Sequence, residues 1–314
     1  MKRVAITGIS GYIGNMLLQR LERQEDVESI IGIDLRAPSS ASPKLKFYPR
    51  DIRGPFADIL VDNQVDTAVH LAFVVRPTHD YTGAHRIAIE GSQNFLEACQ
   101  QASVECLLYL SSHLVYGPHP DNPIPITEES PLRPIRSFPY SWDKAEVDRM
   151  FQDFMKRSPD TCSIIVRTCA VTGPQGGGAG LTNLFTPIMI RPMGYDPPWQ
   201  FVHEDDLTEL ISTLLSQKQK GIFNSAGEGF LRYREIIAAI GKPSIALPAS
   251  LLSLLINLSW RLHLQSNSPA GGLEMIKYPI VISTEKLKKT TGFEFRYSSR
   301  EALMSLINTK RSTS

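Results

Sequence analysis

The feature that most constrains the fold is a glycine-punctuated stretch near the start of the chain, residues 4–14. Val4 to Thr7 are mostly β-branched and apolar, which is typical of a buried strand. Glycines follow at positions 8, 11 and 14, and an amphipathic run with helical spacing continues to residue 21. A strand that leads through a glycine turn into a helix directs backbone N–H groups and the helix N-terminus toward one point. A diphosphate can bind at that point.

Each glycine has its own expected role in this turn. Gly8 permits the tight bend, Gly11 lets the backbone approach a phosphate, and Gly14 lets the helix lie close to the sheet. A second strand at 30–33 ends in Asp34, which lies 20 residues beyond Gly14. An acid at that distance can accept hydrogen bonds from an adenosine ribose. The combination predicts a dinucleotide-binding turn rather than a chance run of glycines.

Strands that alternate with helical segments predict the fold class and its division. The alternation is typical of an α/β Rossmann fold, a doubly wound parallel sheet covered on both faces. We expect residues 1–170 to form the dinucleotide-binding domain, to which residues 201–225 return. Residues 171–200 and 226–314 are expected to form a smaller C-terminal substrate lobe.

Composition favours a soluble globular protein that acts on a small molecule. The net charge of +1 gives no reason to expect a nucleic acid as partner. The cysteine spacing suggests no metal site, so no metal is expected. The most apolar segment, residues 249–264, is too short and too polar to span a bilayer, while contact with a membrane surface stays open. No leader precedes the first strand, so we expect a cytoplasmic location.

Tyr140 and Lys144 are the strongest catalytic candidates. They lie four residues apart in a helical segment, so their side chains leave the same face one turn apart. A lysine ammonium beside a phenol lowers the pKa of the phenol from about 10 toward neutrality, which makes tyrosine a usable general acid and base. Ser112 follows a predicted strand, where its hydroxyl could hydrogen-bond the substrate oxygen. A nicotinamide would then exchange hydride with the carbon that bears this oxygen.

The order of these motifs resembles the extended short-chain dehydrogenase/reductase family, and within it the NAD-dependent epimerase/dehydratase branch. The resemblance weakens after about residue 226 and rests on Thr7-Gly8-x-x-Gly11-x-x-Gly14, Ser111-Ser112-His113-Leu114-Val115-Tyr116-Gly117, Tyr140-x-x-x-Lys144 and Phe201-Val202-His203-Glu204-Asp205-Asp206. It implies that Ser112, Tyr140 and Lys144 are catalytic and that Lys144 also holds the nicotinamide ribose.

The same resemblance implies a set of cofactor-binding positions. Asp34 favours NAD because it would repel a 2′-phosphate, while Arg36 leaves NADP open. The implied cofactor-binding residues are Gly8, Ser10, Gly11, Tyr12, Ile13, Gly14, Asp34, Leu35, Arg36, Asp51, Ile52, Leu71, Ala72, Phe73, Tyr140 and Lys144.

Departures from the family pattern bear on the substrate. His113-Leu114 stands where sugar-nucleotide dehydratases usually place an acid pair, so the groups that eliminate water are missing. Ala170 replaces an asparagine that often helps to hold a nucleotide sugar, and Trp199 stands where an arginine often pairs with diphosphate. We therefore expect a substrate that is not strongly anionic, with His113, Trp199 and Arg232 as candidate contacts.

Three functions remain open at this level. The first is an NAD(P)-dependent oxidoreductase acting on a secondary alcohol or ketone. The second is a nucleotide-sugar epimerase with tightly bound NAD, and the third is a cofactor-sensing protein without catalysis, against which the intact Ser112, Tyr140 and Lys144 argue. The amphipathic segments 84–99 and 140–155 match those that pair into a four-helix interface in the family, which predicts a homodimer.

Overall fold

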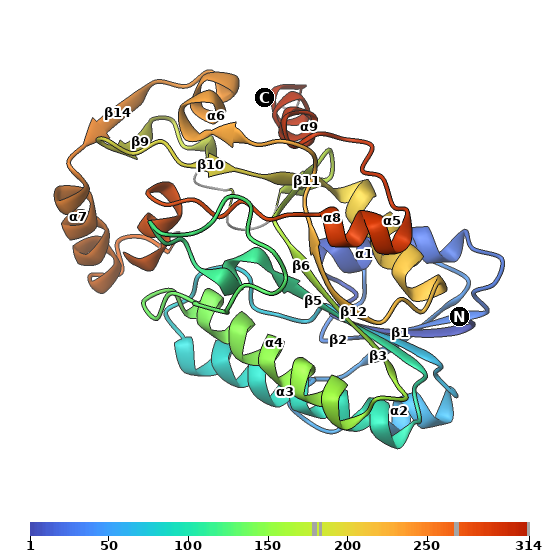
Figure 1. Ribbon diagram of the computed structural model, residues 1–314. Helices are drawn as coiled ribbons and strands as arrows, with labels where there is room; N and C mark the ends of the chain where they lie inside the picture. Colours follow the sequence, from blue (N-terminus) through green and yellow to red (C-terminus); the bar gives the residue numbers. More distant parts are fainter. Residues whose placement is uncertain (178–180, 182–183, 267–269, 313–314) are drawn as a thin grey trace.

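The computed structural model describes residues 1–177, 181, 184–266 and 270–312 (Figure 1). Within these residues, seven strands form a parallel central sheet: β1 (Arg3–Thr7), β2 (Ser29–Asp34), β3 (Leu45–Pro49), β4 (Thr67–His70), β5 (Cys106–Ser112), β6 (Cys162–Thr168) and β12 (Gly221–Ser225). Their order is β12-β6-β5-β4-β1-β2-β3, so the winding direction reverses between β1 and β4. This is the doubly wound α/β fold expected from the sequence, with a topological switch point beside β1.

Helices cover both faces of the sheet (Figure 1). On one face α1 (Tyr12–Glu22) packs against α5 (Glu204–Ser216), and on the other α3 (Tyr81–Gln101) lies between α2 (Ala57–Asp62) and α4 (Pro139–Arg157). Successive side chains of a strand point to opposite faces. Accordingly Val4 and Ile6 join the core under α1 and α5, whereas Ala5 joins the core under α3 and α4. Burial on both faces explains why the strands are apolar runs rather than alternating ones.

Backbone atoms surround the glycine turn between β1 and α1 so closely that no side chain fits at two of its glycines. Gly8 has a φ of +74°, and a Cβ there would lie 2.5 Å from the backbone nitrogen of Ala72. A Cβ at Gly14 would lie 2.6 Å from the carbonyl oxygen of Ile9. Only glycine therefore fits both positions, as the tight bend and the close helix packing require.

A smaller C-terminal lobe is built from short strand pairs and helices. Its strands pair as β7 (Ala170–Gly173) with β8 (Gly176–Gly177) and β11 (Phe201–His203), β9 (Met189–Pro192) with β14 (Ser244–Leu247), and β10 (Pro198–Trp199) with β13 (Leu231–Arg232). Its helices are α6 (Tyr233–Ile240), α7 (Ala249–Arg261) and α9 (Ser299–Ser312), whereas α8 (Glu285–Thr291) packs against β12 of the central sheet. Within residues 201–225, α5 packs against α1 and β12 joins the central sheet beside β6, whereas β11 pairs with β7 in a separate small sheet.

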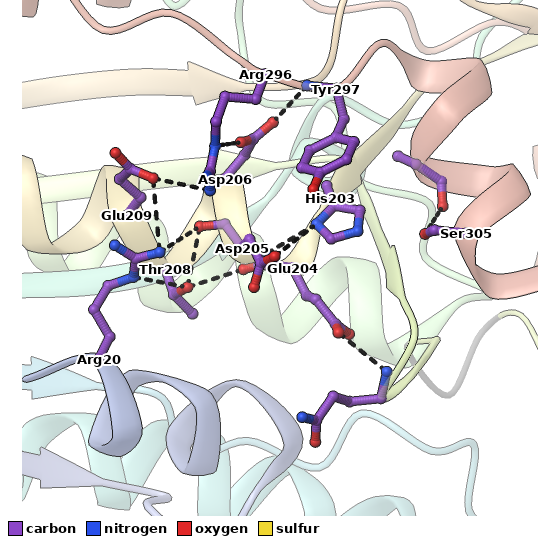
Figure 2. A network of polar contacts seen from close by, with 12 residues as sticks. Arg20, His203, Glu204, Asp205, Asp206, Thr208, Glu209, Arg296, Tyr297 and Ser305 are labelled. Atoms are coloured by element: carbon purple, nitrogen blue, oxygen red, sulfur yellow. Dashed lines mark hydrogen bonds and ion pairs between the residues drawn. The ribbon is translucent and has the colours of Figure 1, made fainter. Parts of the chain in front are cut away.

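A buried carboxylate joins the end of the chain to α5 (Figure 2). Asp206 is fully buried and accepts hydrogen bonds from the Arg296 Nε, at 3.2 Å, and from the Tyr297 backbone N–H, at 3.1 Å. Arg296 also pairs with Glu209 at 2.9 Å, and Glu209 lies 3.6 Å from Arg20 of α1. The acidic end of the Phe201–Asp206 motif therefore fastens the C-terminal segment to the Rossmann helices.

The crowding at Gly14 predicts a strong effect of one added methyl group. Gly14→Ala should lower the free energy of unfolding by about 1–3 kcal/mol, because backbone atoms rather than a flexible side chain occupy the space. Urea denaturation measures this change. Gly54→Ala is the matched control, since a Cβ there would lie 3.7 Å from its nearest neighbour, the Asp51 carbonyl oxygen. Equal stability of the two variants would contradict the prediction.

Candidate active site

Ser112, Tyr140 and Lys144 are brought together at the carboxyl end of β5. Ser112 is the last residue of β5, and the other two lie in the first turns of α4. The Ser112 hydroxyl accepts a hydrogen bond from the Leu114 N–H at 3.2 Å and also forms one with the Tyr140 hydroxyl. Ser112 and Lys144 are buried and Tyr140 is partly buried, so small changes in charge are felt strongly here.

Lys144 occupies an aromatic cage. Its ammonium lies 4.0 Å from the ring centre of Phe73 and 4.7 Å from that of Tyr109. The Nζ donates a hydrogen bond of 2.7 Å to the carbonyl oxygen of Leu110. Burial lowers the pKa of Lys144 to about 7, against the opposing influence of the Asp148 carboxylate. Lys144 is therefore poised to hold or release a proton near neutral pH.

The sequence predicts that Lys144 lowers the pKa of Tyr140, and in the folded chain this prediction is wrong. Burial raises the pKa of Tyr140 to about 12, and the hydrogen bond from Ser112 offsets only part of this rise. The Lys144 ammonium does not counter it, since its Nζ donates to Leu110 and its own pKa has fallen. In this environment the cost of burying a phenolate exceeds the benefit of a nearby lysine. Tyr140 is consequently protonated at neutral pH.

The glycine turn forms a cradle for an anion. The N-cap of α1 is Gly11, which has no side chain to satisfy the first N–H groups of the helix. Asp34 lies beside this cradle, because its carboxylate accepts hydrogen bonds from the N–H groups of Ser10, at 3.1 Å, and Leu35, at 2.7 Å. The Ser10 hydroxyl donates to the carbonyl oxygen of Arg36. The turn and the end of β2 thus form one connected unit.

The segment after β4 connects this cradle to the catalytic side chains. The Leu71 N–H donates to the Thr7 carbonyl oxygen at 3.1 Å, and Ala72 lies against Gly8. Phe73 then meets the ring of Tyr140 edge to face, with 5.5 Å between ring centres. Residues 71–73 are therefore in contact with both the proposed cofactor turn and the proposed proton donor.

Four other expected cofactor residues are already engaged within the protein. The Asp51 carboxylate pairs with Arg53, which lowers the pKa of Asp51, and the Ile52 side chain is buried against α3. The Tyr12 hydroxyl donates to the Glu204 carboxylate, and burial together with this carboxylate raises the pKa of Tyr12 well above its usual value. The side chain of Ile13 packs partly against the core under α1. Asp51 and Tyr12 would have to keep or exchange these partners when a nucleotide binds.

The three expected substrate residues differ in their surroundings. His113 lies next to Ser112, and its Nδ1 donates to the Thr168 carbonyl oxygen at 3.1 Å. Burial lowers the pKa of His113 to about 4, so its ring is neutral at pH 7. Trp199 and Arg232 belong to the β10–β13 pair of the lobe. The Trp199 Nε1 donates to the Met275 carbonyl oxygen at 3.0 Å, and Arg232 is exposed.

A buried ion pair behind the catalytic strand is absent from the sequence-based candidates. Asp148 and Arg167 are 0% and 2% exposed in their side chains and 2.8 Å apart. Asp148 also accepts a hydrogen bond of 2.6 Å from Ser111, and Arg167 donates to Tyr116 at 2.9 Å. The sequence feature that could have revealed this pair is Arg167, a charged residue near the end of an otherwise apolar strand. The pair anchors α4 to β5 and β6, and so holds Tyr140 opposite Ser112.

The chain is similar to known proteins in sequence and in fold. A model of the "NAD dependent epimerase/dehydratase family" matches residues 4–226. An uncharacterised protein of Mycobacterium tuberculosis is 26% identical over 309 residues, covering 96% of this chain and 82% of its own length. A UDP-glucose 4-epimerase of Lactobacillus helveticus is 30% identical over 158 residues, covering 47% of this chain and 46% of its own. The crystal structure of Thermus thermophilus UDP-glucose 4-epimerase with NAD shares the fold, with a TM-score of 0.76 at 19% identity over 99% of this chain and 100% of that one.

The Asp148–Arg167 pair should contribute strongly to stability. Asp148→Asn leaves the Arg167 charge buried without its partner, so we expect a loss of about 3–5 kcal/mol in the free energy of unfolding. Asp153→Asn is the control on the same helix, since its pair with Lys156 is exposed and its loss should cost at most about 1 kcal/mol. Urea unfolding distinguishes them, and similar losses would contradict the assigned role of Asp148.

The buried lysine predicts a pH dependence of stability. Above pH 7 the folded chain holds Lys144 neutral, whereas the unfolded chain keeps that proton until near pH 10.5. The unfolded state then binds more protons, so the contribution of Lys144 to stability rises with pH, by at most about 1.4 kcal/mol per unit. The stability of the wild type relative to Lys144→Met should therefore increase from pH 7 to 9. Lys156→Met, an exposed lysine on the same helix, controls for loss of a charge.

Proposed function

Because the chain belongs to the NAD-dependent epimerase/dehydratase family, we propose that it is an NAD-dependent oxidoreductase acting on a secondary alcohol or ketone. The observation that carries the proposal is the meeting of Ser112, Tyr140 and Lys144 in one shielded site, joined to the glycine turn through residues 71–73. NAD, which the solved structural relative binds, would supply the hydride acceptor or donor.

The residues of the turn fit a dinucleotide. The uncapped first turn of α1 suits a diphosphate, and Asp34 is placed to accept hydrogen bonds from an adenosine ribose. The Asp34 carboxylate favours NAD over NADP, because a 2′-phosphate would meet its negative charge. Arg36, whose carbonyl oxygen accepts from Ser10, is exposed beside the turn and is the residue through which NADP could be accommodated.

Tyr140 is proposed to move the proton. With a pKa of about 12 it carries its proton at neutral pH, so it can donate to the carbonyl oxygen of a ketone. Ser112 holds the Tyr140 hydroxyl and can donate to the same oxygen. Lys144, with a pKa of about 7, can supply positive charge when the phenolate forms. Because Tyr140 is protonated before the reaction, the site is suited to reduce a ketone by donating that proton to its oxygen.

The neighbours of the triad support a redox outcome. His113 is neutral at pH 7, and its Nδ1 proton is committed to Thr168, so it offers no acid for the elimination of water. Ala170 and Trp199 present no charge to a diphosphate, which favours a substrate without strong negative charge.

A nucleotide-sugar epimerase is the alternative. It is favoured by the match to the Lactobacillus UDP-glucose 4-epimerase, at 30% identity over 158 positions. The same triad would serve that reaction, with the hydride returned to the opposite face of the sugar.

Turnover of added cofactor distinguishes the two functions. The wild type should reduce members of a ketone panel with net consumption of NADH, followed at 340 nm. Tyr140→Phe should lower kcat by about 10²–10⁴-fold, because the proton donor is lost. Purification with tightly bound NAD, no net consumption and interconversion of UDP-sugars would instead support the epimerase.

The two neighbouring serines provide a matched control. Ser112→Ala should lower kcat with little change in the free energy of unfolding. Ser111 donates to buried Asp148 instead, so Ser111→Ala should lower stability by about 1–3 kcal/mol and affect kcat less. The reverse pattern would contradict the choice of Ser112.

We also propose a homodimer through α3 and α4. The two helices pack side by side, and His85 of α3 lies 2.8 Å from Asp143 of α4. Analytical ultracentrifugation at micromolar concentration tests this assembly, and a monomer at that concentration would contradict it.

A further inference from the structure

The helix α7 presents an apolar face that the described part of the chain leaves exposed. Leu254, Leu258 and Leu262 are 63%, 52% and 58% exposed, and Leu251 and Leu255 lie beside them at 42% and 46%. Their spacing of three, four and seven residues places them on one stripe that spans about 100° of the helix. The inward side of the helix is formed by buried residues such as Leu252 and Trp260.

The buried side of this helix packs against the loop that precedes α3. Trp260 stacks on His79 with 4.0 Å between ring centres, and the ring centre of His263 lies 4.2 Å from that of His79. His79 belongs to the loop that follows Phe73, whose ring contacts Tyr140. The inward side of α7 is therefore joined to the loop that continues from Phe73.

The charge around the stripe points to the nature of its partner. No aspartate or glutamate occurs between Gly241 and Leu273, whereas Lys242, Arg261 and His263 lie in that segment. Arg261 is exposed and flanks the leucine stripe at the last turn of the helix. An apolar stripe with a basic edge and without acids is complementary to an anionic lipid surface. An ordinary protein partner requires no such absence of acids.

The length of α7 sets its orientation. Its 13 residues extend about 20 Å, less than the ~30 Å of a bilayer core. Among the described residues no helix is long and apolar enough to cross a membrane. A helix of this length can instead lie along the interface with its leucines at the acyl boundary.

We propose that α7 docks the protein onto the surface of an anionic bilayer through its leucine face. Docking would hold the side of the molecule that carries α7 against the lipid. The proposal does not depend on the reaction that the site performs, since it rests on the surface of α7 alone.

Vesicle flotation tests the docking. The wild type, with the full chain, should float with vesicles of phosphatidylcholine containing about 30% phosphatidylglycerol, and less with pure phosphatidylcholine. Leu254→Ser combined with Leu258→Ser should weaken the partition at least about tenfold, because two of the most exposed side chains lose their apolar contact. Arg261→Glu should weaken binding to the anionic vesicles only.

Controls separate docking from folding and from catalysis. Val61→Ser on α2 removes another exposed apolar side chain, 49% exposed, at the opposite end of the molecule (Figure 1), and should bind vesicles as the wild type does. Circular dichroism and NAD binding of the double variant should match the wild type, so a failed enzyme assay leaves this test intact. Absence of wild-type flotation would overturn the proposal. So would self-association that the two leucine substitutions abolish, since the stripe would then be an interface between copies.

Discussion

The close approach of two backbones at the switch point underlies both halves of the site. The turn after β1 and the segment after β4 touch at Gly8 and Ala72, where no side chain fits between them. The same segment continues into Phe73, which contacts both Tyr140 and the Lys144 ammonium. One contact between main chains therefore sets the position of the glycine turn relative to Tyr140 and Lys144.

Burial governs the chemistry of this site more than charge pairing does. It raises the pKa of Tyr140 and lowers that of Lys144, so near neutral pH Tyr140 keeps its proton and Lys144 carries only part of its charge. A bound cofactor would alter the charge and the water content around both groups. The site is consistent with a resting state in which the proton is kept on the phenol until substrate arrives.

Two fully buried carboxylates, Asp148 and Asp206, serve the architecture. The Asp148–Arg167 pair ties α4 to the two strands beneath it, and the Asp206–Arg296 contact ties the C-terminal segment to α5. The first pair joins two consecutive elements to β5, and the second joins segments about 90 residues apart in the sequence. A buried, fully bonded charge tolerates little displacement, so these pairs fix the relative positions of the elements rather than merely adding stability.

Short-range patterns in the sequence were sufficient to predict the doubly wound fold, the glycine turn and the shared helical face of Tyr140 and Lys144. The fold followed from the alternation of strand and helix patterns along the chain. The turn and the shared face depend on residues that lie close together in the sequence. The pKa of Tyr140, by contrast, depends on the packing of Phe73 and Ser112 around it, and these residues come from separate strands and loops. The pairing of β11 with β7 and of Asp206 with Arg296 likewise joins segments that are not neighbours in the chain. The run of leucines alone also did not predict which side of α7 faces outward. Burial and long-range contact exist only in the folded chain, and they decided the electrostatics of the site and the surface that surrounds it.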